Sequence, residues 1–282
     1  MVHKIKLTYS FVAEVIQEFI QDRGSLFAAA ISFFGLISFI PLMLLAVGVF
    51  GYIIGSYDTA LQKVLSFAGN LIPVGADTLA ENLRALSEQS DLLSGLGLLG
   101  LLWIGIQVMV ILQQVMNIAL GSEKHVSFLR TRAMALGMVI VAGVLFALSI
   151  GITSLLTAVR HYQAELFGVG TQDLKIVWDI FAIIASAAVS ILAFTFIYRF
   201  LPNKRIGTTG PVMGGITAGL LFEIAKHVFR WYVTNYADFS RVYGSLGSVL
   251  ILVVWIYYVS IITVLGAEVA SVYARREESS GE

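Results

Sequence analysis

The 282-residue sequence has no cysteine, four prolines, four histidines and few charged residues. Without cysteine the chain has no disulfide, thiolate metal ligand or cysteine nucleophile. The histidines are too widely separated in sequence to form a metalloprotease-type pair: His3, His125, His161 and His227. Charged residues make up only 13% of the chain, whereas ordinary soluble domains have roughly 25%. This deficit argues against a soluble domain.

Five long segments contain no charged residue at all. They lie between these pairs: Arg23 and Asp58, Asp91 and Glu123, Arg132 and Arg160, Asp179 and Arg199, and Arg241 and Glu268. A helix needs about 20 mostly apolar residues to cross a bilayer core. We therefore predict an all-α integral membrane protein, a bundle of about six transmembrane helices. The expected spans are residues 26–54, with Pro41 as a kink, then 94–120, 133–158, 176–198, 211–233 and 243–272.

Amphipathic segments are expected outside the spans. In the N-terminal segment, residues 1–25, one helical face is apolar, with Phe11, Val12, Val15, Ile16 and Phe19. The opposite face carries Glu14, Gln17, Glu18 and Gln21. This pattern is typical of a helix on the membrane surface, and equally of one packed on the bundle. A second, external amphipathic segment is expected within 57–91, where Leu79, Leu83 and Leu86 share a face. The transmembrane domain is predicted at 26–273, followed by a polar tail at 274–282.

The basic residues that flank the predicted spans indicate the orientation. Most of them fall on the side that holds both termini, among them Lys4, Lys6, Arg130, Arg275 and Arg276. By the positive-inside rule both termini are expected in the cytoplasm. With 18 basic and 18 acidic residues, no excess of positive charge indicates nucleic acid as a partner.

The fifth predicted span contains ionisable residues, which are costly in lipid and are functional candidates there. Glu223, Lys226, His227 and Arg230 fall on about a third of the helix circumference. One hypothesis is a basic cleft, open toward the outer leaflet, that binds an anionic group with the help of Arg241. The alternative is that Glu223 pairs with Lys226 or His227 on its own helix while Arg230 extends to the interface.

The second predicted span has a polar face formed by carboxamides: Gln107, Gln113, Gln114 and Asn117. Such groups bridge helices in lipid, and a solute path is the alternative. The lone carboxylates Asp179 and Glu268 are expected to bond a backbone group or a neighbouring arginine. Glycine pairs at four-residue spacing permit close helix approach: Gly51 with Gly55, Gly210 with Gly214, and Gly215 with Gly219.

No motif of an enzyme is present. The sequence has no Walker loop, nucleophile elbow or acidic cluster suited to two-metal chemistry. We therefore predict no catalytic residue, metal or cofactor. Membrane lipids are the expected partners, and a homo-oligomer is compatible with the sequence.

Several motifs, in this order and spacing, resemble the YihY/BrkB family of bacterial inner-membrane proteins from residue 22 to residue 270. They are Asp22, Ala28-Ala29-Ala30 and Ser38-Phe39-Ile40-Pro41-Leu42; Trp103 and Asn117; Tyr198-Arg199-Phe200-Leu201-Pro202-Asn203; and Tyr243-Gly244-Ser245-Leu246, Trp255 and Leu265-Gly266-Ala267-Glu268. Phe33, Phe34 and Ala270 depart from the family pattern, which often has tyrosines at the first two positions and asparagine at the third.

The resemblance implies an inner-membrane, six-helix protein. It also implies a rigid cytoplasmic corner made by Tyr198, Arg199, Pro202 and Asn203. The family has been called a ribonuclease, which the lack of a metal or nucleophile constellation argues against. Some members are associated with serum resistance and with lipid or lipopolysaccharide export. The leading expectation is transport or export of an anionic lipid or envelope precursor, and the alternatives are an envelope-assembly scaffold and, third, a membrane-bound hydrolase or nuclease.

Overall fold

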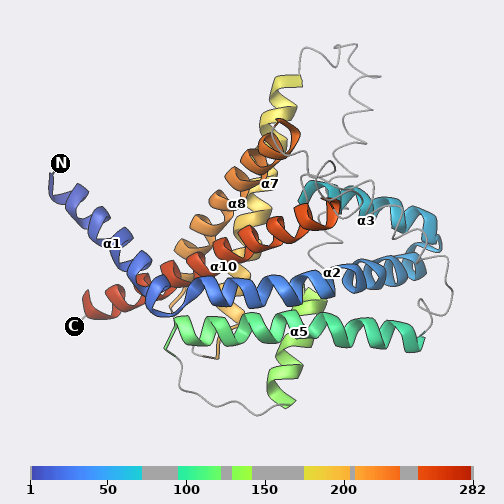
Figure 1. Cartoon of the computed structure of the whole chain (residues 1–282), viewed down its shortest axis with the longest axis horizontal. Helices are drawn as coiled ribbons and strands as arrows, with labels where there is room; N and C mark the ends of the chain where they lie inside the picture. Colours follow the sequence, from blue (N-terminus) through green and yellow to red (C-terminus); the bar gives the residue numbers. More distant parts are fainter. Residues whose placement is uncertain are drawn as a thin grey trace.

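A computed structural model of the chain describes residues 2–71, 95–121, 129–141, 175–203, 207–235 and 247–280. Within these ranges the regular structure is helical and contains no strand. Besides a helical segment at 129–141, the helices are α1 (Val2–Gln21), α2 (Gly24–Ile54), α3 (Tyr57–Leu71), α5 (Gly95–Ala119), α7 (Lys175–Phe200), α8 (Thr209–Asn235) and α10 (Gly247–Ser280) (Figure 1).

Five of these helices, α2, α5, α7, α8 and α10, are long and apolar enough to cross a membrane. They correspond to five of the six predicted spans, and the predicted class, an all-α integral membrane protein, is confirmed. Of the remaining predicted span, 133–158, only residues up to 141 belong to the described part of the chain.

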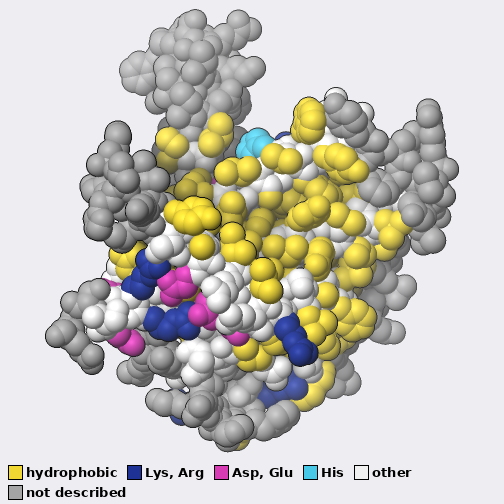
Figure 2. All heavy atoms as spheres, turned by 60° about the vertical axis from the view of Figure 1, so that its left-hand side comes forward, with side chains coloured by type: hydrophobic (Ala, Val, Ile, Leu, Met, Phe, Trp, Pro, Cys, Tyr) yellow, Lys and Arg dark blue, Asp and Glu magenta, His cyan; other side chains and the backbone are white. Residues whose placement is uncertain are grey.

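Large apolar side chains are exposed along the outside of the bundle. Phe33 on α2 is 59% exposed, Leu192 on α7 is 65% exposed and Ile224 on α8 is 59% exposed. Figure 2 shows a broad apolar area, with charged side chains gathered toward one edge of this face. A soluble monomer rarely exposes contiguous apolar patches of such extent. Here the exposed side chains are the surface that lipid covers.

Contacts between the spans fix their directions. Gly35 of α2 lies against Ile256 of α10, and Figure 1 shows these two helices running in opposite directions. The hydroxyl of Ser271 on α10 donates to the carbonyl oxygen of Ala119 on α5 at 2.7 Å. The starts of α2 and α8 and the ends of α5, α7 and α10 therefore lie at one end of the bundle, which we call the proximal end. Helices α2 and α8 diverge from there, α2 ending at the right and α8 toward the top of Figure 1, and we call this opposite side the distal end.

Glycines let α8 pack closely on two neighbours at once. Gly214 faces α10, where an added Cβ would lie 2.5 Å from the carbonyl oxygen of Gly266. Gly215 faces α7, where an added Cβ would lie 1.9 Å from Oγ1 of Thr195. Gly210 and Gly219 continue the two rows, the first toward α10 and the second toward α7. Both glycine pairs predicted on this helix thus pack within the chain.

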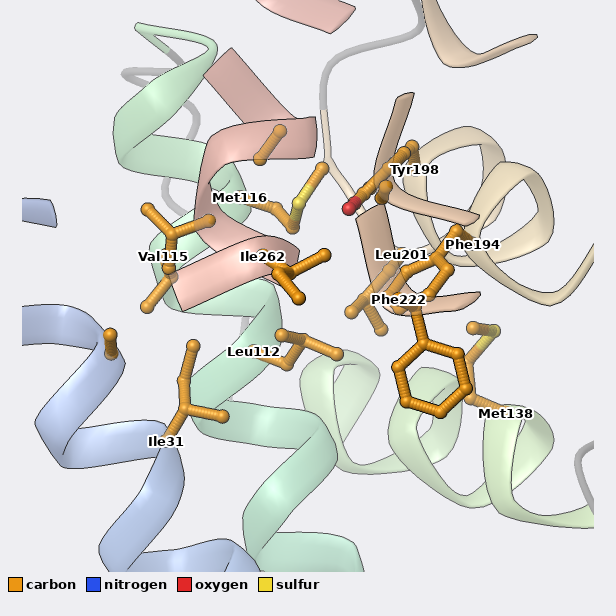
Figure 3. Close-up of a cluster of buried hydrophobic side chains, with 14 of the residues drawn as sticks. Ile31, Leu112, Val115, Met116, Met138, Phe194, Tyr198, Leu201, Phe222 and Ile262 are labelled. Atoms are coloured by element: carbon orange, nitrogen blue, oxygen red, sulfur yellow. The ribbon is translucent and has the colours of Figure 1, made fainter. Parts of the chain in front are cut away.

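The bundle core combines apolar side chains from all five spans. Phe194 and Tyr198 of α7 stack with ring centroids 6.1 Å apart. Phe222 of α8 packs edge-on against Phe194 and tilted against Trp255 of α10. Figure 3 shows part of this cluster, to which α2 and α5 contribute Ile31, Leu112, Val115 and Met116.

Helix α1 packs on the proximal part of α10 and also keeps an exposed apolar stripe. Phe11 and Val15 contact a small cluster that includes Val269 and Val272. The exposed stripe consists of Tyr9, Val12, Ile16 and Ile20. The two predicted roles of this helix are therefore compatible, because one face meets the bundle while the adjacent one is free to meet lipid.

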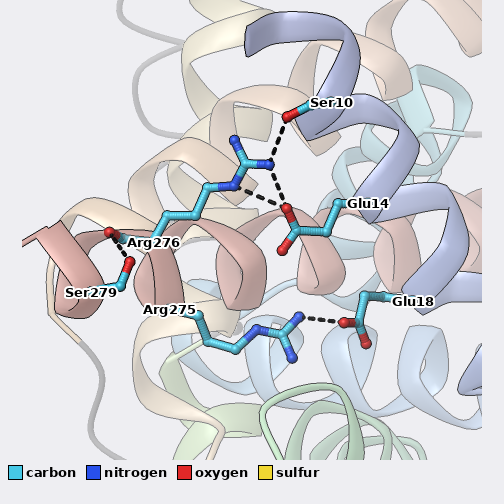
Figure 4. Close-up of polar contacts among 6 residues, drawn as sticks. All are labelled: Ser10, Glu14, Glu18, Arg275, Arg276 and Ser279. Carbon is cyan, nitrogen blue, oxygen red and sulfur yellow. Dashed lines mark hydrogen bonds and ion pairs between the residues drawn. The ribbon is translucent and has the colours of Figure 1, made fainter.

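Two ion pairs join α1 to the last turns of α10 (Figure 4). Arg275 lies 2.9 Å from Glu18, and Arg276 pairs with Glu14 while also donating to Ser10. Residues 274–280, predicted as part of a polar tail, continue α10 as helix through Ser280. Arg275 and Arg276 are therefore part of helix α10, and their side chains meet α1.

Two sharp turns connect the first three helices. Arg23, with φ of 54°, adopts the left-handed conformation between α1 and α2. Gly55, with φ of 75°, ends α2, and the Ser56 hydroxyl then accepts from the backbone N–H of Thr59 at the start of α3. Helix α3 occupies the first part of the predicted external amphipathic segment, and the leucines at 79, 83 and 86 lie outside the described residues.

Candidate functional site

Four polar side chains meet between α7 and α8 in an otherwise apolar part of the bundle. We call them the serine–ion-pair cluster: Ser186, Ser190, Glu223 and Lys226. Glu223 Oε2 lies 2.9 Å from the ammonium of Lys226. Its Oε1 accepts hydrogen bonds from Ser190 at 2.7 Å and from Ser186 at 3.2 Å. Lys226 also donates to the Ser186 hydroxyl at 3.0 Å.

The glycine row on α8 positions this cluster. Gly215, Gly219 and Glu223 follow each other at four-residue spacing, so they share the face that meets α7. Ser186 and Ser190 have the same spacing on α7, which runs antiparallel to α8. Close packing at the two glycines brings the backbones together, and the serines then reach Glu223 across the interface. Sequence reasoning missed both serines, although their spacing in an apolar span was a signal.

The cluster lies in the distal half of the bundle and is largely closed off from the surroundings. Glu223 is 13 residues beyond Gly210, which corresponds to about 20 Å along the helix. The side chains of Lys226 and Glu223 are only 13% and 11% exposed. The ammonium of Lys226 also lies 5.3 Å from the ring centroid of Phe222. A matched ion pair with two hydroxyl donors is how a membrane protein keeps charges at this depth.

Two other predicted members of the basic cleft, His227 and Arg230, lie outside the serine–ion-pair cluster. His227 is exposed, and its Nδ1 lies 2.8 Å from the carbonyl oxygen of Glu223 on its own helix. Arg230 is exposed one turn nearer the distal end, and Arg241 lies outside the described residues. The structure thus brings together Glu223 and Lys226, with His227 and Arg230 on the adjacent outer surface of α8.

The polar face of α5 divides into two parts. Gln113 is 1% exposed, and its Nε2 donates to the carbonyl oxygen of Leu201 at 3.0 Å and to Asn203 Oδ1 at 3.2 Å. Asn117 Oδ1 accepts from the backbone N–H of Asn203 at 2.8 Å. Gln107 is half-buried and Gln114 is exposed. Gln113 and Asn117 therefore hold the turn that follows α7.

The motif residues at this turn are also fixed by packing. The hydroxyl of Tyr198, which is fully buried, donates to the carbonyl oxygen of Thr263 at 2.9 Å. Arg199 donates to the carbonyl oxygen of Gly207 at 3.3 Å. Pro202 is buried beside them. These contacts make a tightly held corner at the proximal end.

The remaining motif residues are spread over the bundle. Pro41 lies inside α2, and the ring of Trp103 on α5 is 5.0 Å from the guanidinium carbon of Arg132. Tyr243 and Gly244 lie outside the described residues. The motif therefore does not form one pocket among the described residues.

Glu268 of α10 does not behave as predicted. It is 1% exposed, and its Oε2 has no hydrogen-bond partner in the described part of the chain. The expectation was a bond to a backbone group or to an arginine. Arg275 instead pairs with Glu18.

No group of three or more His, Asp or Glu side chains able to hold a metal ion occurs in the described ranges. The described carboxyl side chains are spread over the proximal end, the serine–ion-pair cluster and the first turn of α3, where Asp58 lies. The absence of a cofactor and of catalysis stays a prediction.

The apolar spans, lipid-exposed surfaces and internal polar contacts define a multi-pass integral membrane protein. The model of a family described as Virulence factor BrkB matches residues 15–282. The chain belongs to this family, which confirms the resemblance noted from its motifs.

Curated relatives are similar over nearly the whole chain. The "UPF0761 membrane protein lpg0643" of Legionella pneumophila is 29% identical, over 99% of this chain and 66% of its own length. A UPF0761 membrane protein of Aeromonas salmonicida is 25% identical, over 96% of this chain and 91% of its own length. A Bacillus subtilis protein named YfkH and described as ribonuclease-like is 25% identical, over 97% of this chain and 98% of its own length.

The chain thus spans just under two thirds of the length of the Legionella relatives and most of the length of the other two proteins. No solved structure matches the chain.

Proposed function

We propose that this protein has a transport-like role in the bacterial inner membrane, exporting an anionic lipid or an anionic envelope precursor. The observation that carries the proposal is the ion pair of Glu223 and Lys226, buried with two serines in the distal half of the bundle. Charged groups at such a depth are costly and occur mainly where they act on a substrate or an ion.

The ion pair is not needed to hold α7 against α8. Gly215 and Gly219 already bring the two backbones into van der Waals contact, and the aromatic core fixes their registration. Replacing a buried ion pair by apolar groups is often neutral or stabilising. A purely structural role therefore does not explain why two charges are kept there.

In the proposed mechanism the pair keeps the empty site neutral. An anionic headgroup competes with Glu223 for the ammonium of Lys226, and the hydroxyls of Ser186 and Ser190 continue to hold the displaced carboxylate. His227 and Arg230, exposed on the same helix, attract the headgroup at the membrane surface before it enters. With both termini in the cytoplasm, as the basic residues predict, this surface faces the outer leaflet.

The proposal is tested with purified full-length protein in lipid vesicles. Tail-labelled phosphatidylglycerol and phosphatidylcholine are compared, and an impermeant reductant quenches label as it reaches the outer leaflet. We expect faster transfer of the anionic lipid. Lys226→Gln removes a charge-assisted bond of about 1.5–3 kcal/mol, which corresponds to a rate loss of about 10–150-fold.

Lys63→Gln on α3 is the charge-matched control and is expected to transfer lipid at the wild-type rate. Membrane level and elution profile of each variant are compared with those of the wild type. Wild-type activity in both Lys226→Gln and Arg230→Ala would remove the cluster from the mechanism. A wild-type protein that transfers no lipid, tolerates both changes and co-purifies with stable partners would favour the envelope-assembly scaffold.

A further inference from the structure

Glu268 is the most deeply buried carboxyl group in the described part of the chain, and no described side chain forms an ion pair with it. Glu268 is 1% exposed, compared with 9% for Glu223, which has a lysine and two serines as partners. Oε2 of Glu268 has no hydrogen-bond partner among the described residues. An ionised carboxylate without a partner is among the most costly groups to bury.

The charged groups around Glu268 do not supply a counter-ion. Three charged residues act on it electrostatically. They are Glu18 on α1, Asp22 in the turn before α2, and Arg275, which is seven residues further along α10. Arg275 pairs with Glu18 at 2.9 Å, and Arg276 pairs with Glu14. Each arginine is thus already matched by an acid.

The carboxyl groups of Asp22 and Glu268 take part in neither of these two ion pairs. The described parts of α2 and α5, which also pack on α10, carry no charged residue on their spans. Arg199 at the end of α7 donates to the carbonyl oxygen of Gly207. With Arg23, which is exposed beside Asp22 in the same turn, the described junction has three arginines for four carboxyl groups, so one negative charge is unmatched if Asp22 and Glu268 are both ionised.

We propose that Glu268 is a proton-binding site at the proximal end of the bundle, with Asp22 and Glu18 as its acidic surroundings. A bound proton neutralises the carboxyl group, so that no unpaired charge is buried there. A metal ion fits less well, because no group of three or more acidic or histidine side chains able to hold one occurs in the described ranges. The site lies apart from the serine–ion-pair cluster and does not depend on the transport-like role.

Asp22 marks the more exposed edge of this junction. It is half-buried at the turn between α1 and α2. Partial burial raises the pKa of Asp22 above its ordinary value, Glu18 raises this pKa further, and Arg275 opposes the change. The same junction thus favours bound protons at its exposed edge.

Occupancy of the site is linked to the docking of α1. Once Glu268 is ionised, it competes with Glu18 for Arg275 and repels Glu18 and Asp22. Loss of the proton therefore weakens one of the two ion pairs that join α1 to α10, and α1 responds to pH at the face where both termini lie.

The test is infrared spectroscopy of the purified full chain, which needs no transport substrate. A protonated carboxyl group in an apolar site gives a carbonyl-stretch band that an ionised carboxylate lacks. We expect this band at neutral pH in the wild type, unchanged when sodium or potassium is added. Glu268→Gln should lack it, whereas Glu277→Gln, at an exposed position on the same helix, should keep it.

Glu268→Asp guards against loss of the fold in Glu268→Gln, because it keeps a carboxyl group and should give a band at a displaced frequency. The proposal is overturned if the wild type has no protonated-carboxyl band at neutral pH. It is equally overturned if the band persists in Glu268→Gln, or if sodium or potassium abolishes it, which would assign the site to a metal cation.

Discussion

An added Cβ on Gly215 of α8 would lie 1.9 Å from Oγ1 of Thr195 on α7 and 2.7 Å from the Thr195 backbone nitrogen. Rotating the threonine side chain relieves the first contact but not the second. The two helices are therefore separated by the smallest distance that their backbones permit at this point.

Gly215→Ala is expected to destabilise the protein. The methyl group forces α7 and α8 apart, and overpacking of this kind costs about 1–3 kcal/mol. The measurement is the thermal unfolding midpoint in detergent. Gly137→Ala is the control, since an added Cβ there meets nothing within 4 Å and alanine favours helix. An unchanged midpoint in Gly215→Ala would mean that α7 and α8 do not pack this closely.

Gln113→Met is expected to loosen the corner that follows α7. The change keeps the approximate size of the side chain but leaves the carbonyl oxygen of Leu201 and Asn203 Oδ1 without their donor. Leaving buried acceptors unpaired costs about 1–3 kcal/mol. Gln114→Met, at the exposed neighbouring position, should have little effect. Protease sensitivity of the corner, compared at equal protein amounts, distinguishes the two variants.

Substitutions of Lys226 and Glu223 are expected to have non-additive effects on stability, because the two side chains form a direct ion pair. Lys226→Met leaves the Glu223 carboxylate buried without a cation, which costs about 3–5 kcal/mol. Combining it with Glu223→Gln removes that charge as well, so the double variant should be more stable than Lys226→Met alone. Unfolding midpoints of the four proteins in the cycle measure the coupling, and additive effects would argue against a direct pair.

Asp22→Asn is expected to alter the pH dependence of stability. Because the folded chain holds the proton of Asp22 more tightly than the unfolded chain does, this group stabilises less as pH rises through its raised pKa. The asparagine variant has no such loss, so its stability relative to the wild type should increase with pH above the ordinary aspartate range. Asp58→Asn on the exposed first turn of α3 is the control, and an equal gain there would contradict the assignment.

The spans could be predicted from sequence because a long run without charged residues is rare outside transmembrane helices. The first was expected at 26–54 and α2 covers Gly24–Ile54, while the fourth was expected at 176–198 and α7 covers Lys175–Phe200. Solubility in hydrocarbon acts on every residue of a span, so the signal is strong. The amphipathic pattern of α1 was equally visible in the sequence.

The site could be predicted only in part, because a helical periodicity gives a face but not the neighbour that covers it. Glu223 and Lys226 were identified as candidates from the sequence. The role of Ser186 and Ser190 becomes visible only when α7 is packed against α8, which brings their hydroxyls to the Glu223 carboxylate. The isolation of Glu268 depends on Arg275 pairing with α1. That pairing in turn requires α10 to continue beyond its predicted end.

The two glycine rows of α8 restrict how the bundle can move. Sliding α8 by one turn past α7 would bring Pro211 or Glu223 to a glycine position where an added Cβ already meets the α7 backbone, and sliding it toward its start would place Ala218 at the position of Gly214 against α10. Helices α7, α8 and α10 are therefore expected to move together as one rigid unit. Relative movement within the bundle is then expected where α2 and α5 contact this unit, because larger and more deformable side chains meet there.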